Sequence, residues 1–128
     1  MLKDDDSKCH DPHGHEYVLE VSIQGDVKDQ GTEAGMVMNF GTLKALMMEE
    51  VHDHFDHKFI ADSQDPRLSL FVAAVGSDAV RILPYPPTAE NLAVWIWERI
   101  SAQLPEGITV TEVSLKETSN CTAILTSW

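Results

Sequence analysis

Apolar and polar side chains alternate along residues 16–24, and one face collects Tyr17, Leu19, Val21 and Ile23. A period of two is the pattern of a strand with one buried face. Gly25 and Asp26 follow directly and are typical of a turn. The pattern therefore predicts a half-buried strand over residues 16–24, followed by a charged loop over residues 28–35.

Near the C-terminus, residues 108–118 and 121–128 alternate in the same way and predict two more strands. Ser119 and Asn120, which separate these runs, predict a tight hairpin turn. The alternation slips near Glu112 and Val113, as an extra residue in one strand would cause. We therefore expect a β-hairpin whose first strand carries a bulge.

Two other stretches have helical spacing. Residues 42–51 place Leu43, Leu46 and Met47 on one side, and Asn39 or Thr42 could cap their start. Thr88 is a suitable N-cap for a second helix that runs to about Leu104, with an apolar stripe made of Leu92, Ile96, Ile100 and Leu104. Residues 79–83 predict a short strand, whereas residues 61–76 mix polar and apolar positions and predict no clear element.

The predicted order is therefore strand, helix, short strand, helix, strand, strand. Helices gathered on one face of an antiparallel sheet form an α+β fold, and we expect two helices on that face. The chain has 128 residues, of which 43% are hydrophobic, which suits one domain over residues 1–128 with a packed core.

The formal net charge is −12, which argues against nucleic acid or a membrane surface as the partner, because both attract basic proteins. An anionic substrate would need the few cations gathered at its site, including cations of a neighbouring subunit. No apolar run is long enough to span a bilayer. Cys9 and Cys121 lie far apart and no secretory signal precedes them, so we expect a reducing, cytoplasmic location.

The first candidate site lies just before the first predicted strand. His13 and His15 are separated by one residue, so on an extended chain their imidazoles point the same way and could fill two corners of a tetrahedral zinc site. Cys9 adds a thiol that could act as a ligand or a nucleophile. The alternative is a His-rich surface loop without bound metal.

Two further candidates lie in the middle and near the end of the chain. A turn would bring the carboxylate of Asp56 against His57 and fix the ring's orientation; the alternative is an ordinary polar helix end. Glu117 falls on the apolar face shared by Val113 and Leu115, so it either reaches into a ligand site or lies at an exposed strand end. A carboxylate of this kind could accept two N–H bonds from the edge of a heterocycle.

Five segments in this order resemble the 6-pyruvoyl-tetrahydropterin synthase family, and in particular its bacterial branch that forms 6-carboxy-tetrahydropterin. They are residues 9–17, 35–44, 55–58, 87–93 and 116–118. The gap between Cys9 and His13 is short, as in the carboxy-forming branch, whereas the pyruvoyl-forming enzymes have a longer gap. The resemblance covers roughly residues 8 to 126.

The resemblance implies a tunnelling fold, in which antiparallel sheets of several protomers close into a barrel. The implied assembly is a homo-oligomer, either a trimer or a dimer of trimers, with active sites between subunits. The implied reaction is that of a zinc-dependent lyase, a carbon–carbon and carbon–oxygen lyase. It would convert 7,8-dihydroneopterin triphosphate to 6-carboxy-5,6,7,8-tetrahydropterin with release of acetaldehyde and triphosphate, early in queuosine and 7-deazaguanine biosynthesis.

The resemblance also implies a role for each matching residue. His13 and His15 would bind Zn2+, and Cys9 would be the general base. Asp56 and His57 would complete a proton relay, and Glu117 would hold the pterin ring. Thr88 and Glu90, in the fourth matching segment, would contact the substrate.

The chain departs from the family's pattern in two places. The family usually carries a strand before the cysteine that ends in a histidine, the third zinc ligand, and Met1 and Leu2 fall just after its expected position. His10 could substitute as a ligand. Asn39 stands where the family usually has Asp and should still cap a helix. Two other functions stay open: a catalytically silent pterin- or purine-binding protein, and a 6-pyruvoyl-tetrahydropterin synthase.

Overall fold

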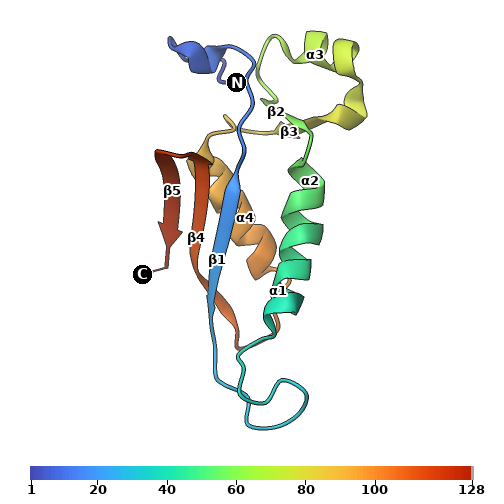
Figure 1. Cartoon of the computed structure of the whole chain (residues 1–128). Helices are drawn as coiled ribbons and strands as arrows, with labels where there is room; N and C mark the ends of the chain where they lie inside the picture. The colour runs from blue at the N-terminus through green and yellow to red at the C-terminus, as the bar shows by residue number, and fades with distance from the viewer. Residues whose placement is uncertain (128) are drawn as a thin grey trace.

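A computed structural model describes residues 1–127, and its centre is a three-stranded antiparallel sheet (Figure 1). The strands are β1 (Val18–Gln24), β4 (Thr109–Thr118) and β5 (Cys121–Thr126), in the order β1-β4-β5. The predicted antiparallel sheet and its two-residue hairpin turn are therefore confirmed.

The predicted bulge is also present, next to its expected position. Ser22 pairs with Glu112, whereas the next residue of β1, Ile23, pairs with Val110. Thr111 is consequently the extra residue, and its hydroxyl donates a hydrogen bond to the Ser22 carbonyl over 3.3 Å. An extra residue of this kind bends the strand and increases its twist.

The first helical region is longer than predicted. It comprises α1 (Phe40–Met47), a π-helical turn η2 (Met48–His52) and α2 (Asp53–Phe55). Asn39 caps its start, because the Asn39 side chain accepts from the Gly41 N–H over 2.7 Å. The expected end at residue 51 was wrong, since the wider π turn carries the helix on through polar residues.

The second predicted helix is α4 (Ala89–Ser101), which begins at the predicted cap. Thr88 Oγ1 accepts from the Asn91 N–H over 3.2 Å. The apolar stripe is buried at Leu92, Ile96 and Ile100. Leu104 lies beyond the helix and is only half-buried, so the expected end of the helix was too late.

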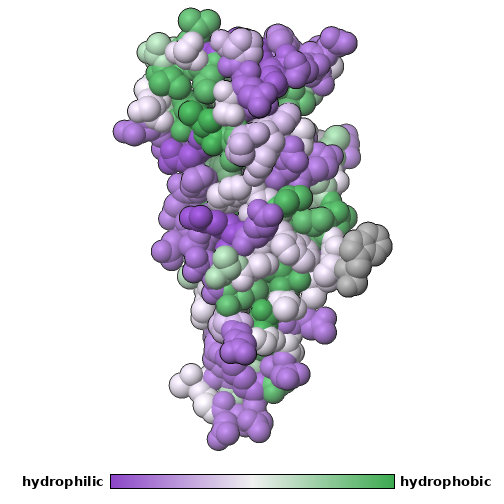
Figure 2. Space-filling view, turned by 180° about the vertical axis from the view of Figure 1, so that it is seen from behind, coloured by the Kyte–Doolittle hydropathy of each residue, from purple (hydrophilic) through white to green (hydrophobic). Residues whose placement is uncertain are grey.

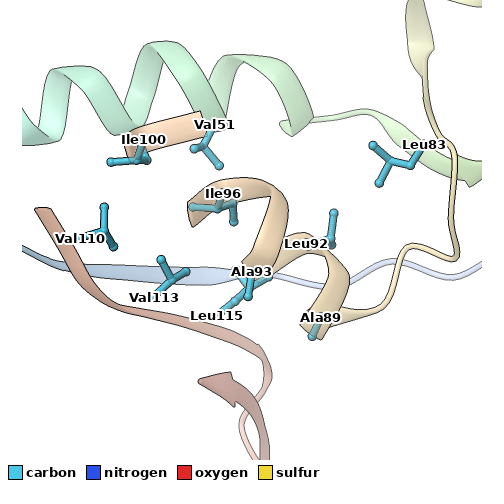
Figure 3. Packing of buried hydrophobic residues seen from close by; sticks show 10 residues of the cluster. All are labelled: Val51, Leu83, Ala89, Leu92, Ala93, Ile96, Ile100, Val110, Val113 and Leu115. Carbon is cyan, nitrogen blue, oxygen red and sulfur yellow. The ribbon is translucent and has the colours of Figure 1, made fainter. Parts of the chain in front are cut away.

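The core lies between the sheet, α4 and the first helical region (Figure 3). Val110, Val113 and Leu115 of β4 face α4, and Val51 joins the same cluster from η2. Both predicted helices therefore pack on one face of the antiparallel sheet, which is the α+β arrangement expected from the sequence.

A second, smaller unit was predicted only in part: the short strand expected over residues 79–83 is present, whereas a partner strand and the helix between the two strands were not expected. β2 (Phe59–Asp62) and β3 (Val80–Leu83) form a parallel pair that is connected through α3 (Leu68–Val75) and a short turn η3 (Ser77–Ala79). This unit lies beside the N-terminal segment and its turn η1 (Lys8–His10), at the end of the molecule away from the loop before α1 (Figure 1). Figure 2 shows hydrophobic surface gathered over this end, where Leu70 and Val75 are exposed.

Both edge strands of the main sheet, β1 and β5, have no second partner within the described residues. β1 pairs only with β4, and residues 1–17 contain η1 as their one regular element. Unpaired strand edges tend to be covered by another chain or segment. No helix within residues 1–127 is long and apolar enough to cross a membrane.

Candidate functional site

A cavity of about 1130 Å³ opens where the start of β1, the end of β4, the end of α2 and the start of α4 meet. Among its lining residues are all the candidates named from the sequence except His10: Cys9, His13, His15, Asp56, His57, Thr88, Glu90 and Glu117. These residues are distributed over the whole chain, so their convergence is a property of the fold. Their individual chemical roles stay predictions.

The register of the main sheet brings the first and last of these segments together. Leu19 lies opposite Leu115, and Val18 lies opposite Lys116. Since side chains alternate, the next pair on the inner face beyond Leu19 and Leu115 is Tyr17 with Glu117. The Tyr17 hydroxyl indeed donates to Glu117 Oε1 over 3.5 Å.

Glu117 occupies a break in the sheet. On its other side, Lys116 pairs with Thr122 and Thr118 pairs with Cys121, so the register shifts at Glu117 and leaves it without a partner in β5. A bulge can turn a side chain toward a site in this way. The Glu117 carboxylate is half-buried, and its Oε1 lies 3.3 Å from His15 Nε2.

Tyr17 provides a neutral donor to this carboxylate. Burial, together with the charge of Glu117 and the hydrogen bond to it, raises the pKa of Tyr17 to about 12. The phenol therefore stays protonated at neutral pH. Both contacts of Glu117 use Oε1, so Oε2 can accept a hydrogen bond from a ligand.

His13 and His15 lie side by side, with ring centroids 4.8 Å apart and ring planes at 86°. Nδ1 of His13 lies 2.7 Å from the Asp11 carbonyl oxygen. A hydrogen bond from Nδ1 to a carbonyl leaves Nε2 to bind a metal, which is the usual arrangement of a histidine ligand. The two imidazoles therefore have the donor chemistry that zinc prefers.

Within the described residues, His13 and His15 are not joined by a third side chain that could complete a metal site. Within residues 1–127, no group of three or more His, Cys, Asp and Glu side chains is arranged to hold a metal ion. His10, considered as a substitute ligand, does not line the cavity. Its carbonyl oxygen instead accepts a hydrogen bond from Arg67 Nη1 over 2.6 Å.

Cys9 lies on the short turn η1 and is exposed, with a free thiol. Ser7 caps the turn, because Ser7 Oγ accepts from the Cys9 N–H over 3.2 Å. Leu2 donates its N–H to the Cys9 carbonyl over 2.7 Å. The thiol therefore lies at the rim of the cavity, on an element that has no buried residue of its own.

Asp56 and His57 end the first helical region. His57 has φ +54°, the left-handed conformation that commonly follows a helix end, and its side chain is 92% exposed. His57 Nδ1 lies 2.9 Å from Asp56 Oδ2, so the two side chains form the predicted pair. The hydrogen bond from His57 holds the pKa of Asp56 below its ordinary value of 3.8.

The sequence analysis gave no specific role to several residues that line the cavity. His52 is one helical turn before Asp56, and its Nε2 lies 3.7 Å from Asp56 Oδ2. Lys44 and Lys58 place two cations at the cavity of an otherwise acidic protein. Helical spacing could have found His52 and Lys44, and the period of two could have found Tyr17, because each shares a face with a residue that was recognised.

Thr88 and Glu90 line the cavity from the first turn of α4. The Thr88 hydroxyl oxygen already accepts the hydrogen bond that caps the helix. Glu90 is exposed and makes the acidic first turn of the helix. A helix N-terminus next to a cavity carries a partial positive charge, which Glu90 offsets.

Comparison with known proteins identifies relatives along almost the whole chain. A family model described as 6-pyruvoyl tetrahydropterin synthase matches residues 1–127. A probable 6-carboxy-5,6,7,8-tetrahydropterin synthase of Halobacterium salinarum is 35% identical over 122 residues, which are 95% of this chain and 75% of that protein. A 6-carboxy-5,6,7,8-tetrahydropterin synthase of Rickettsia bellii is 37% identical over 117 residues, which are 90% of this chain and 83% of that protein.

A relative that is named for a different activity is similar to the same degree. The 6-pyruvoyl tetrahydrobiopterin synthase of Dictyostelium discoideum is 37% identical over 113 residues, which are 88% of this chain and 69% of that protein. Among solved structures, an uncharacterised protein from Wolinella succinogenes matches with a TM-score of 0.77 at 21% identity, covering 94% of this chain and 82% of that chain. That structural likeness supports the fold alone.

The Asp56–His57 pair can be tested by titration. We expect carbon NMR of the Asp56 carboxyl to give a pKa below 3.8, and His57→Gln to raise it toward that value. Because the folded-state pKa is the lower one, the pair's contribution to stability is complete above the unfolded pKa. It is lost as the pH falls through the folded pKa.

His52→Gln is the matched control. Its Nε2 lies farther from the carboxylate, at 3.7 Å, so this replacement should shift the Asp56 pKa less than His57→Gln does. A pKa at or above 3.8 in the unaltered protein would show that the pair does not form in solution.

Proposed function

The chain belongs to the 6-pyruvoyl tetrahydropterin synthase family, a family of enzymes, and from that premise we propose that it is a lyase of the 6-carboxytetrahydropterin synthase type. The proposed reaction converts 7,8-dihydroneopterin triphosphate and one water to 6-carboxy-5,6,7,8-tetrahydropterin, acetaldehyde and triphosphate, as an early step toward queuosine and other 7-deazaguanines. The observation that carries the proposal is one cavity that collects every candidate residue except His10, from segments far apart in the sequence.

We propose that Glu117 recognises the pterin ring. A half-buried carboxylate can accept N–H bonds from the amino group and the adjacent ring nitrogen of a pterin. Tyr17 holds Glu117 Oε1 at 3.5 Å, and His15 lies 3.3 Å from the same oxygen while no zinc is bound, so the carboxylate is oriented before a ligand arrives. A preoriented carboxylate loses less entropy on binding than a mobile one.

Proton transfer is assigned to the other side of the cavity. The Cys9 thiolate would take a proton from the carbon side chain of the substrate, the general-base role. His57, oriented by Asp56 at 2.9 Å, would give or take a proton at the departing fragment. Cys9 lies on η1, whereas Asp56 and His57 lie at the end of α2. The proposed reaction therefore requires both elements to hold their positions at the cavity.

His13 and His15 are the proposed zinc ligands. Zinc at this position would supply Lewis-acid polarisation of the hydroxyl groups of the substrate side chain. The Asp11 carbonyl holds the His13 ring in the tautomer whose Nε2 can bind the ion. His15 would have to turn its bonding nitrogen from Glu117 toward the ion, and this would leave Glu117 Oε1 to Tyr17.

Lys44 and Lys58 are the proposed contacts of the triphosphate. The net charge of −12 repels a polyanion, so local cations at the cavity are required. Lys58 Nζ currently donates to the Asp78 carbonyl over 3.0 Å and would have to exchange that bond for a phosphate oxygen. Cations of a neighbouring subunit would add to these two.

A second candidate reaction is that of a 6-pyruvoyl-tetrahydropterin synthase. The Dictyostelium discoideum relative named for that activity is as similar in sequence as the Rickettsia bellii relative, since both are 37% identical to this chain. The short gap between Cys9 and His13 favours the carboxy-forming reaction. The identity of the product distinguishes the two.

We further propose that the protein works as a homo-oligomer, a trimer or a dimer of trimers whose sheets close a barrel. The outer edge of β1 has no partner within the described residues, and closing a ring would cover it. His57 is 92% exposed, and a neighbouring copy would shield it from water. Cys9 and Cys121 both have free thiols, which suits the reducing environment of the cytoplasm.

Activity is tested with purified protein, added zinc and 7,8-dihydroneopterin triphosphate. We expect acetaldehyde and 6-carboxytetrahydropterin in equal amounts, and we expect Cys9→Ser to lower kcat by roughly 10²- to 10⁴-fold, the usual cost of losing a general base. Cys121→Ser, which removes the other free thiol, should leave kcat nearly unchanged. A pyruvoyl product would favour the second candidate, and no turnover by zinc-loaded protein would reject both reactions.

Pterin recognition is tested separately, by the binding of a pterin that lacks the triphosphate. We expect Glu117→Gln to weaken binding by about 10- to 100-fold, because it removes a charge-assisted bond worth roughly 1.5–3 kcal/mol. Glu112→Gln is the matched control, since Glu112 lies on the same strand and points to the other face. Equal affinity of the two variants would exclude Glu117 from the pterin site.

The assembly is tested by sedimentation equilibrium. We expect the mass of three or six protomers at micromolar concentration, because closing the barrel pairs the open edge of β1. A purely monomeric protein that still turns over substrate would contradict the placement of the site between subunits.

A further inference from the structure

The turn that carries Cys9 is held from a distant part of the chain, and we propose that Arg67 is a positioning residue for the Cys9 thiol. Arg67 directly precedes α3, in the small unit formed by β2, α3 and β3. Its Nη1 donates to the carbonyl oxygen of His10, the residue after Cys9, over 2.6 Å. The inference rests on the proposed function, because that function gives Cys9 the role of general base.

Asp65 fixes the direction of the guanidinium. Arg67 Nε donates to Asp65 Oδ1 over 3.0 Å, and Arg67 Nη2 donates to Asp65 Oδ2 over 2.9 Å. The side chain of Asp65 is 1% exposed and that of Arg67 is 24% exposed. A planar guanidinium held at two nitrogens by a buried carboxylate cannot rotate, so Nη1 points at a defined place.

The carboxylate is ionised wherever this pair is formed. The hydrogen bonds from Arg67 hold the pKa of Asp65 below its usual range. Asp65 Oδ1 also accepts from the backbone N–H of Arg67 over 2.9 Å, so the loop before α3 is fixed together with the side chain. The anchor is therefore rigid at neutral pH.

The turn η1 needs such an anchor, because its remaining contacts are local. It has no buried residue, and its hydrogen bonds run to Ser7, Asp11 and Leu2. A single exposed turn with few apolar contacts opens at low free-energy cost. Lys3 also contacts the small unit, from its Nζ to Gln64 Oε1 over 3.4 Å, but this contact is weak and exposed.

We expect the loss of the Arg67 contact to lower the reaction rate more than it lowers the stability of the fold. A general base acts only when it lies within hydrogen-bond reach of the proton, and a displacement of about 1 Å can lower the rate by roughly 10²-fold. Arg67 would thus set the position of the Cys9 thiol over the cavity without touching the substrate. The alternative is that Asp65 and Arg67 only stabilise the start of α3.

The test compares Arg67→Met with Arg99→Met. Arg99 also pairs with a carboxylate, through one hydrogen bond from its Nε to Glu50 Oε2 over 2.7 Å, and it lies away from the N-terminal segment. In Arg67→Met we expect faster hydrogen–deuterium exchange in the peptide containing residues 2–11, by about tenfold. We also expect iodoacetamide to alkylate Cys9 at least about threefold faster relative to Cys121 of the same molecule, because the loosened turn leaves the cavity.

Turnover provides the second measurement. We expect kcat to fall by roughly 10- to 100-fold in Arg67→Met while KM changes by less than about twofold, since pterin recognition is assigned to Glu117. Arg67→Lys, which keeps one donor toward His10 but loses the fork, should give an intermediate kcat. Arg99→Met should leave kcat, exchange and alkylation as they are in the unaltered protein.

Two results would overturn the inference. Unchanged exchange and an unchanged alkylation ratio in a folded Arg67→Met protein would show that Arg67 does not hold the turn. A lower melting temperature with unchanged kcat would show that the pair is merely structural. Lack of turnover by the unaltered protein would reject the proposed function instead, and the exchange and alkylation measurements would still decide whether Arg67 positions Cys9.

Discussion

The antiparallel register of β1 against β4 is the constraint on which the rest of the structure depends. Because Leu19 faces Leu115, the chain just before β1 must run alongside the end of β4. Tyr17 and His15 consequently meet Glu117, although 100 residues separate Tyr17 from Glu117 in the sequence. A slip by one residue would turn these side chains to the opposite face and divide the cavity.

The other elements are positioned relative to this sheet. Ile96 and Ile100 of α4 pack on Val110 and Val113, and this packing fixes the start of α4 at the cavity. Val51 joins the same core, so the end of the first helical region is fixed as well and presents the Asp56–His57 pair. The small unit adds the last restraint, since Arg67 reaches back to the turn that carries Cys9.

Local sequence patterns were sufficient to predict the three strands of the main sheet and the two helices that pack on it. The period of two predicted all three strands of the main sheet, and the caps at Asn39 and Thr88 were recognisable as residue types. The helix over Leu68–Val75 escaped prediction because it is apolar on most sides and has no side-chain cap. The parallel pair β2–β3 escaped because nothing local specifies a partner some twenty residues away in the sequence.

The candidate site was predictable as a set of residue types and not as a set of contacts. Histidines, a thiol and carboxylates can be recognised one segment at a time, and the resemblance to a known family related the segments to one another. Contacts such as those from Tyr17 to Glu117 and from Arg67 to His10 join residues 100 and 57 positions apart, so they follow only from the folded chain. Once the contacts are known, their chemical roles can be inferred from general physical chemistry.

The central claim is that the sheet register, the end of α2 and the turn of Cys9 create one site for a pterin and a zinc ion. A crystal structure of the protein soaked with zinc and a pterin, with data collected at the zinc absorption edge, tests it most directly. The account predicts an anomalous peak against His13 and His15 and a pterin ring at Glu117, both within the same cavity. Zinc or pterin bound on an unrelated surface, with this cavity empty, would contradict it.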